Sequence, residues 1–184
     1  MNPRDIPNAL TVARILVIVP TVWALAREEY GLALALFAVA GLSDALDGYL
    51  AKRFDWSTRL GAILDPIADK GLLTTTYVTL AWLGHIPVWL VVAVLARDVI
   101  IVVGATAYYV LIGRYEMSPT FISKVNTFLQ IAFGVFVVAS LTWSDFAAPV
   151  VAWLTYLVLA TTVLSGIDYV WTWSRRAWHA KHHP

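Results

Sequence analysis

The sequence predicts an all-α integral membrane protein, a bundle of six transmembrane helices that forms one domain over residues 1–184. Of its 184 residues, 60% are hydrophobic and only 14% are charged, whereas soluble domains have about 25% charged residues. Six apolar stretches are each long enough for a helix that spans a bilayer, which takes roughly 20 residues. They cover residues 9–27, 30–51, 61–83, 87–112, 120–141 and 147–173. Because lipid offers the backbone no hydrogen-bond partners, each stretch is expected to be helical.

Short segments of turn and interface residues separate the six stretches from one another. They read REEY, KRFDWSTR, GHIP, GRYEMSP and TWSDFAAP. The first stretch allows one alternative, because apolar residues followed by an A-x-A-like end also fit a cleaved signal peptide over residues 1–26. Its removal would leave five spans and break the charge pattern of the loops.

The basic residues of the loops predict the orientation of the chain. With the N-terminus inside, eight of them lie on the cytoplasmic side and only Arg27 lies outside. The eight are Arg4, Lys52, Arg53, Arg59, Arg114, Arg175, Arg176 and Lys181. Cytoplasmic loops carry such an excess of Lys and Arg, so both termini are expected in the cytoplasm. The absence of an Arg/Ser-rich transit segment before Arg4 favours a bacterial cytoplasmic membrane.

Four aspartates lie at helical spacings on either side of the basic loop 52–60. Asp44 and Asp47 are three residues apart in the second stretch, and Asp65 and Asp69 are four residues apart in the third. These spacings place each pair on one face of its helix. Because the loop is short, the two helices are expected to pack antiparallel. The four carboxylates would then lie together near the cytoplasmic surface.

Such a cluster predicts a divalent metal site. Four carboxylates in one site repel one another and need countercharge, and Mg²⁺ or Mn²⁺ prefers carboxylate oxygens and often bridges to substrate phosphates. Two such ions would organise a pyrophosphate. The basic residues Lys52, Arg53 and Arg59 suit an anionic substrate. The alternative is that the aspartates are solvated or paired structurally with nearby Lys and Arg, although ionisable residues within membrane spans are usually functional.

The same stretch resembles the signature of the CDP-alcohol phosphotransferase family, D-x-x-D-G-x-x-A-R-x8-G-x-x-x-D-x-x-x-D. The matching residues are Asp44, Asp47, Gly48, Ala51, Lys52, Gly61, Asp65 and Asp69. Lys52 stands where the family usually has Arg; it keeps the charge but lacks the bidentate fork. The resemblance extends over the six-span layout.

The resemblance implies an enzyme that transfers a phosphatidyl group from a CDP-linked donor, usually CDP-diacylglycerol, to an alcohol with release of CMP. In the family the first three aspartates bind metal. The fourth, here Asp69, contributes to the metal site and is the proposed general base. The residues implied for the CDP pocket are Asp44, Gly48, Ala51, Lys52 and Gly61. Family members are homodimers whose site opens to the cytoplasmic leaflet, and no nucleic acid partner is expected.

Two further segments bear on the acceptor alcohol. ARDVIIVVGA at 96–105 and PTFISKVNTFLQ at 119–130 resemble the fourth and fifth spans of eukaryotic-type, CMP-forming cardiolipin synthases. Lys124, Arg97 and Arg14 are candidate acceptor-phosphate ligands. The alternatives are that Arg97 joins helices through the surroundings of Asp98 or through Asp168, and that Arg14 reaches to the interface. Ser123, Asn126 and Thr127 fit hydrogen bonds between helices.

The resulting hypothesis is a metal-dependent cardiolipin synthase that uses CDP-diacylglycerol and phosphatidylglycerol. One alternative is a phosphatidylglycerophosphate synthase, which would use glycerol 3-phosphate. A remote alternative is a cation transporter, although the four aspartates lie near one surface and the other half of the bundle offers few acids. A structural scaffold would explain none of the acids.

Overall fold

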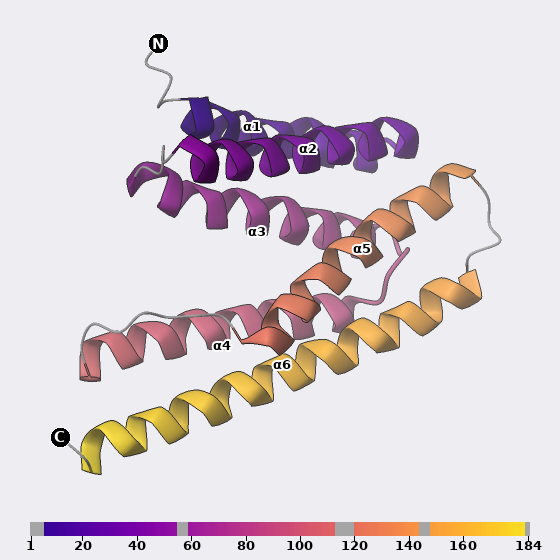
Figure 1. The fold of residues 1–184 in the computed structure, drawn as a ribbon. Helices are drawn as coiled ribbons and strands as arrows, with labels where there is room; N and C mark the ends of the chain where they lie inside the picture. The colour runs from indigo at the N-terminus through magenta and orange to yellow at the C-terminus, as the bar shows by residue number, and fades with distance from the viewer. Residues whose placement is uncertain (1–5, 55–58, 113–119, 144–147, 183–184) are drawn as a thin grey trace. The chain divides into compact units, whose positions relative to one another are not determined.

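The computed structural model of the protein describes residues 6–54, 59–112, 120–143 and 148–182, and these form six α-helices (Figure 1). The helices are α1 (Ile6–Ala26), α2 (Tyr30–Phe54), α3 (Arg59–Trp82), α4 (Val88–Ile112), α5 (Phe121–Trp143) and α6 (Ala148–His182). The all-α prediction is confirmed, and each predicted stretch has become one helix. The largest difference is in α6, which continues to His182 beyond the predicted end at residue 173.

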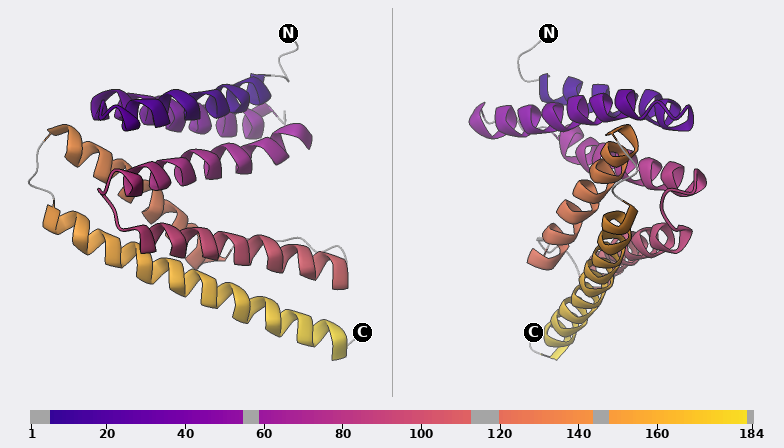
Figure 2. Two further views of the ribbon diagram at one scale, coloured as in Figure 1. Left: turned by 180° about the vertical axis from the view of Figure 1, so that it is seen from behind. Right: turned by 90° about the vertical axis from the view of Figure 1, so that its right-hand side faces the viewer.

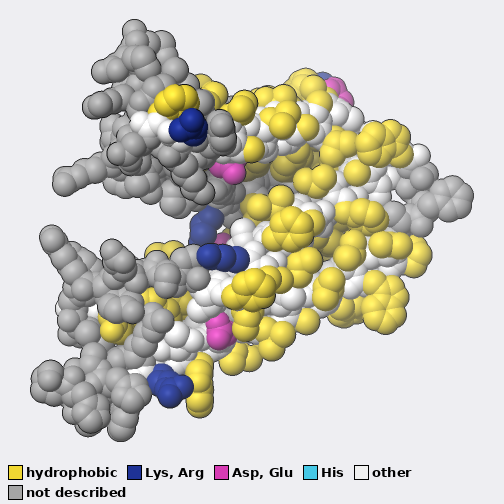
Figure 3. Space-filling model, in the orientation of Figure 1, with side chains coloured by type: hydrophobic (Ala, Val, Ile, Leu, Met, Phe, Trp, Pro, Cys, Tyr) yellow, Lys and Arg dark blue, Asp and Glu magenta, His cyan; other side chains and the backbone are white. Residues whose placement is uncertain are grey.

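Four of the described helices contain segments that are long and apolar enough to cross a membrane. These are Ala9–Ala26, Val88–Tyr108, Phe121–Trp143 and Pro149–Trp173. Helix α2 adds a shorter apolar stretch, Tyr30–Leu46. Figure 3 shows apolar side chains over much of the described surface, as expected where lipid is the solvent. The chain is therefore an integral membrane protein. That α2 and α3 also cross the membrane stays a prediction; their adjoining ends carry the aspartates.

The chain divides into two compact units. The first comprises residues 1–86 and 134–147, with α1, α2, α3 and the second half of α5. The second comprises residues 87–133 and 148–184, with α4, the first half of α5 and α6. Whether both belong to one domain, as the sequence predicts, stays a prediction.

In the first unit, α1 packs against both α2 and α3 (Figure 1). Thr11, Arg14, Thr21 and Ala24 are all buried on α1, and their spacing of three and seven residues is that of a single helix face. Helix α3 lies close to α1 at Gly71, where an added Cβ would be 3.0 Å from Cδ1 of Ile18. The absence of a side chain at Gly71 thus permits the close approach of the two helices.

Two helices of this unit end in the same kind of cap. Glu28 has φ 60° and Gly84 has φ 80°, so each occupies the left-handed position that follows a helix C-terminus. The next residue in each case donates its N–H five residues back, from Glu29 to the carbonyl of Ala24 and from His85 to that of Leu80. These bonds satisfy carbonyls that the helix end would leave without partners.

The second unit is built on α4 and α6, which run side by side (Figure 2). Tyr169 donates a hydrogen bond of 2.9 Å to the carbonyl oxygen of Ile101. An added Cβ at Gly104 would lie 3.0 Å from the ring of Tyr169. Tyr108 meets Trp173 edge to face, with the ring centroids 4.8 Å apart. Aromatic packing and the hydrogen bond of Tyr169 therefore help to join these two helices.

Candidate active site

The backbone places the four signature aspartates at the joined ends of α2 and α3. Asp44 and Asp47 lie toward the end of α2, and Asp65 and Asp69 lie near the start of α3. Only residues 55–58 separate the two helices. The predicted helical spacings are confirmed, because each pair lies within one continuous helix.

The side chains of most signature residues lie outside the described part of the structure. This holds for Asp47, Gly48, Ala51, Lys52, Gly61, Asp65 and Asp69. Within the side chains that the structure describes, no group of three or more potential metal ligands occurs, since Asp44 is the one signature aspartate among them. The convergence of the four carboxylates and the roles in the CDP pocket therefore stay predictions.

Asp44 forms an ion pair with a buried arginine of α1. Nη1 of Arg14 lies 2.6 Å from Oδ1 of Asp44, and the side chains are 2% and 54% exposed, respectively. A guanidinium stays charged in proteins, and a buried charge without a counterion would be costly. Asp44 supplies that counterion from α2 while more than half of its own surface remains open. Its carboxylate thus meets α1 on one side and open space on another.

The donor set of the aspartates suits a hard divalent cation. A carboxylate has two oxygens with about four lone-pair sites, so a contact with Arg14 does not exhaust the capacity of Asp44. Mg²⁺ and Mn²⁺ prefer such oxygen ligands. The chemistry of Asp44, open on one side and paired on the other, fits a metal ligand whose orientation is held by a neighbouring cation.

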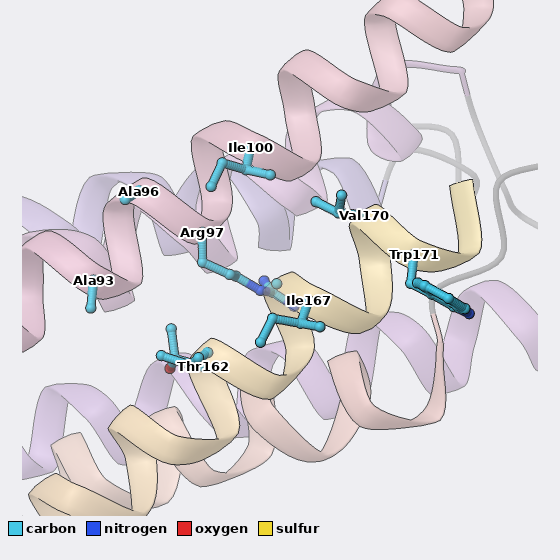
Figure 4. A pocket seen from close by; sticks show the side chains of 10 residues that line it. Ala93, Ala96, Arg97, Ile100, Thr162, Ile167, Val170 and Trp171 are labelled. Atoms are coloured by element: carbon cyan, nitrogen blue, oxygen red, sulfur yellow. The ribbon is translucent and has the colours of Figure 1, made fainter. Parts of the chain in front are cut away.

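Arg97, in the second unit, is engaged by three helices of the described structure. Its side chain is 7% exposed and extends from α4 toward α6 (Figure 4). Nη1 donates to Oδ1 of Asp98 at 2.7 Å, Nη2 to Oγ of Ser165 at 2.8 Å, and a further bond from Nη2 reaches Ser123 on α5. The alternative in which Arg97 joins helices is thus supported, through Asp98 and two serines rather than through Asp168.

A second buried polar group joins α5 to α6 about one helical turn from the two serines that bind Arg97. Asn126 is fully buried, and its Oδ1 accepts hydrogen bonds from Thr161 at 2.9 Å and Thr162 at 3.0 Å. Gln130 donates to Thr162 at 3.2 Å. The prediction of bonds between helices is confirmed for Ser123 and Asn126. It is wrong for Thr127, whose hydroxyl bonds to the carbonyl of Ser123 in its own helix at 3.1 Å.

Lys124 differs from Arg97 in its surroundings, although it lies next to Ser123 in the first turn of α5. Its side chain is exposed, and its backbone N–H donates to the carbonyl of Thr120 at 3.1 Å. The described residues give its ammonium group no hydrogen bond or ion pair. Lys124 is therefore a cation available to a ligand.

A groove of about 510 Å³ lies between α4 and α6 beside Arg97 (Figure 4). Ala93, Ala96 and Ile100 line it from α4, and Gly166 and Ile167 from α6. The stem of Arg97 borders it, since an added Cβ at Gly166 would lie 3.8 Å from Cγ of Arg97. The guanidinium is bonded elsewhere, so the groove presents a mostly apolar surface of the kind that contacts lipid chains.

Comparison with known families identifies the family of this chain. The family model for CDP-alcohol phosphatidyltransferase matches residues 4–172. The chain belongs to this family. The match covers both compact units and every signature aspartate, so the resemblance predicted from the motif is confirmed.

The relatives of this chain include proteins named cardiolipin synthase and proteins named phosphatidylglycerophosphate synthase. The human "Cardiolipin synthase (CMP-forming)" is 37% identical over 169 residues, which cover 81% of this chain and 52% of the human protein. The protein of the same name from Streptomyces coelicolor is 33% identical over 159 residues, covering 80% of this chain and 72% of the relative. A "Probable phosphatidylglycerophosphate synthase" of Mycobacterium tuberculosis is 36% identical over 176 residues, covering 90% and 80%. The chain spans about half the length of the human relative.

Sequence reasoning missed several residues that hold the second unit of the chain together. Ser165 binds Arg97, and Thr161 and Thr162 bind Asn126. A signal was present, because Thr161, Thr162 and Ser165 follow helical spacing within an apolar span. Single hydroxyl residues in membrane helices also bond to their own backbone, so the spacing alone did not identify their partners.

Proposed function

We propose that this phosphatidyltransferase is a cardiolipin synthase, which transfers the phosphatidyl group of CDP-diacylglycerol to phosphatidylglycerol and releases CMP. The observation that carries the transferase activity is the family match over residues 4–172 with all four signature aspartates. The choice of acceptor rests on the resemblance of residues 96–105 and 119–130 to the cardiolipin synthases. The 37% identity to the human protein of that name supports the same choice.

The proposed reaction is an in-line displacement at phosphorus. The acceptor hydroxyl oxygen forms a bond to the phosphorus that carries diacylglycerol, and the bond from that phosphorus to the oxygen of CMP breaks. Asp69 accepts the proton of the hydroxyl as a general base. Asp44, Asp47, Asp65 and Asp69 would hold one or two Mg²⁺ or Mn²⁺ ions, which when bound supply positive charge to the pyrophosphate and the leaving group.

The donor and the acceptor are assigned to different parts of the chain. Gly48, Ala51, Lys52 and Gly61, with Asp44, are proposed to form the CDP pocket. Lys124 is proposed as the principal ligand of the acceptor phosphate, because it is exposed and its ammonium is available. Arg97 is proposed to contribute to the acceptor site by holding Ser123 beside Lys124. Arg14 was also an acceptor candidate; its ion pair with Asp44 supports another role.

One assay separates this function from its alternatives. Purified protein in lipid nanodiscs is incubated with labelled CDP-diacylglycerol, Mn²⁺ and either phosphatidylglycerol or glycerol 3-phosphate, and the lipid products are separated. Cardiolipin and CMP are expected with the first acceptor, and chelation should abolish their formation. If the only product were phosphatidylglycerophosphate, formed from glycerol 3-phosphate, the chain would instead be a phosphatidylglycerophosphate synthase. The 36% identity to the mycobacterial protein of that name favours this alternative.

A transporter would be recognised by a different measurement. Isotope flux of divalent cations in proteoliposomes without CMP release would refute the enzyme. The family match argues against this outcome.

The proposed enzyme spans a bacterial cytoplasmic membrane six times, with both termini and the active site on the cytoplasmic side, and acts as a homodimer. The excess of basic residues on one side supports this orientation. The chain has no cysteine, so single cysteines can report it directly. Glu29→Cys is expected to react with a membrane-impermeant maleimide added to intact cells, and Arg175→Cys only after the cells are opened. The reverse pattern would invert the orientation.

A further inference from the structure

Arg14 is the residue of α1 whose position the proposed reaction does not yet explain. It is 2% exposed, and its Nη1 lies 2.6 Å from Oδ1 of Asp44 on α2. Asp44 is the first aspartate of the signature, and its side chain is 54% exposed. Arg14 thus contacts a residue that the reaction is proposed to use.

The packing of α1 gives this contact a fixed geometry. Thr11 and Thr21 are buried on the same face as Arg14, and Ile18 fits against Gly71 of α3. Helix α1 therefore contacts both helices that carry the aspartates. Because a guanidinium is planar and directs its N–H groups along fixed lines, its contact with Oδ1 restricts the orientations that the carboxylate of Asp44 can adopt.

We propose that Arg14 is a positioning residue for the metal site: it holds the carboxylate of Asp44 through Oδ1 and so orients Asp44 as a ligand for a divalent cation. The inference rests on the proposed function, in which Asp44 binds metal. Residues that hydrogen-bond to a metal ligand orient it, and their loss typically weakens metal binding by about 10–100-fold. In this role Arg14 contacts neither substrate nor metal.

The test measures metal binding without turnover. Mn²⁺ is titrated into the purified protein in nanodiscs without either substrate, and the bound ion is followed by electron paramagnetic resonance. Arg14→Gln is expected to raise the dissociation constant for Mn²⁺ by about 10–100-fold. Arg14→Lys keeps the charge and is expected to fall between wild type and Arg14→Gln. Thermal unfolding of each variant reports whether it is folded.

Thr21→Val is the matched control. Thr21 is fully buried on the same face of α1, and its hydroxyl bonds to the carbonyl of Val17 in its own helix at 2.7 Å. The variant perturbs the buried face of α1 without touching Asp44, so its dissociation constant for Mn²⁺ should equal that of wild type. A rise as large as that of Arg14→Gln would show that Arg14 acts only through the packing of α1 and would overturn the inference.

Other outcomes are also decisive. A folded Arg14→Gln protein with unchanged or tighter Mn²⁺ binding would overturn the positioning role, since tighter binding would mean that Arg14 competes with the metal. If Arg14→Gln cannot be recovered folded, Arg14→Lys carries the test, and binding indistinguishable from wild type then overturns the proposal. Failure of the wild-type protein to bind Mn²⁺ would instead overturn the metal site of the proposed function.

Discussion

Arg14 and Arg97 are both buried arginines paired with an aspartate, but the two pairs are built differently. Arg14 reaches from α1 to Asp44 on α2, and that aspartate is 54% exposed. Arg97 pairs with its neighbour Asp98, which is 19% exposed, and gives its remaining bonds to Ser165 and Ser123. Arg14 pairs with a residue of the signature. The bonds of Arg97 instead connect α4, α5 and α6.

The difference shows why the type of residue does not reveal its role. A charged side chain in a membrane span must find partners, and those partners decide what it can do. When the partner is open to a ligand, as Asp44 is, the pair can orient a functional group. When hydroxyls and a neighbouring carboxylate engage the guanidinium, as at Arg97, the same side chain mainly connects helices.

The largest expected effects distinguish the carboxylates of the two regions. Asp44→Asn, Asp47→Asn or Asp65→Asn should abolish metal-dependent binding of CDP-diacylglycerol and turnover, because each removes a charge from the proposed metal site while keeping the shape of the side chain. Asp98→Asn is the control. Because Asp98 lies outside the signature, this variant should bind Mn²⁺ as the wild-type protein does. The measurements are Mn²⁺ titration and CMP release. Near wild-type turnover in any of the first three would refute that residue as a ligand.

A smaller loss is expected at Asp69, the proposed general base. Asp69→Asn should lower the rate by about 10²–10⁴-fold, the usual contribution of general base catalysis. Binding of CDP-diacylglycerol should fall far less than in Asp44→Asn. Single-turnover kinetics and donor-binding titrations check both statements. Complete loss of donor binding would make Asp69 a primary ligand, and a normal rate would make it dispensable.

Lys124 and Arg97 of the second unit should separate function from stability. Lys124→Ala should raise the KM for the acceptor by roughly 10–100-fold, since a hydrogen bond to a charged group contributes about 1.5–3 kcal/mol, and should leave the thermal unfolding temperature unchanged. Steady-state kinetics with each substrate varied in turn is the measurement. A raised KM for the donor alone would contradict the assignment.

Arg97→Ala, in contrast to Lys124→Ala, should lower the stability of the folded protein. It removes bonds to three helices, and breaking a buried ion pair costs roughly 3–5 kcal/mol; the lower end is expected because Asp98 keeps some exposure. The unfolding temperature should therefore fall in this variant, as measured in detergent. An unchanged temperature together with a raised acceptor KM would show that Arg97 acts as a direct phosphate ligand instead.

The smallest effect is expected at the buried amide. Asn126→Leu removes two accepted hydrogen bonds, but bonds between membrane helices average only about 0.6 kcal/mol. Both threonine hydroxyls can also bond within α6. Unfolding stability should change by at most about 1 kcal/mol, and CMP release should not change. A large loss of turnover would assign Asn126 to the substrate site.

Much of the helical architecture followed from the sequence alone. Lipid imposes helices on long apolar segments, so the six stretches and their approximate ends could be located from composition. The spacing of the aspartates and the basic residues between the two pairs likewise predicted a polar site at the joined ends of two helices, although the predicted loop over 52–60 is shortened to residues 55–58. The signature identified the family that the comparison confirmed.

Only the tertiary structure decided which faces meet. Nothing in the spacing of residues 1–54 indicates that Arg14 faces Asp44, 30 positions along the chain, or that Arg97 finds Ser165 rather than Asp168. Helical periodicity places residues on a common face of one helix, but it carries no information on the neighbouring helix or on the angle of packing. The partner of a buried charge depends on both, and so its role emerged only when the helices were placed together within each unit.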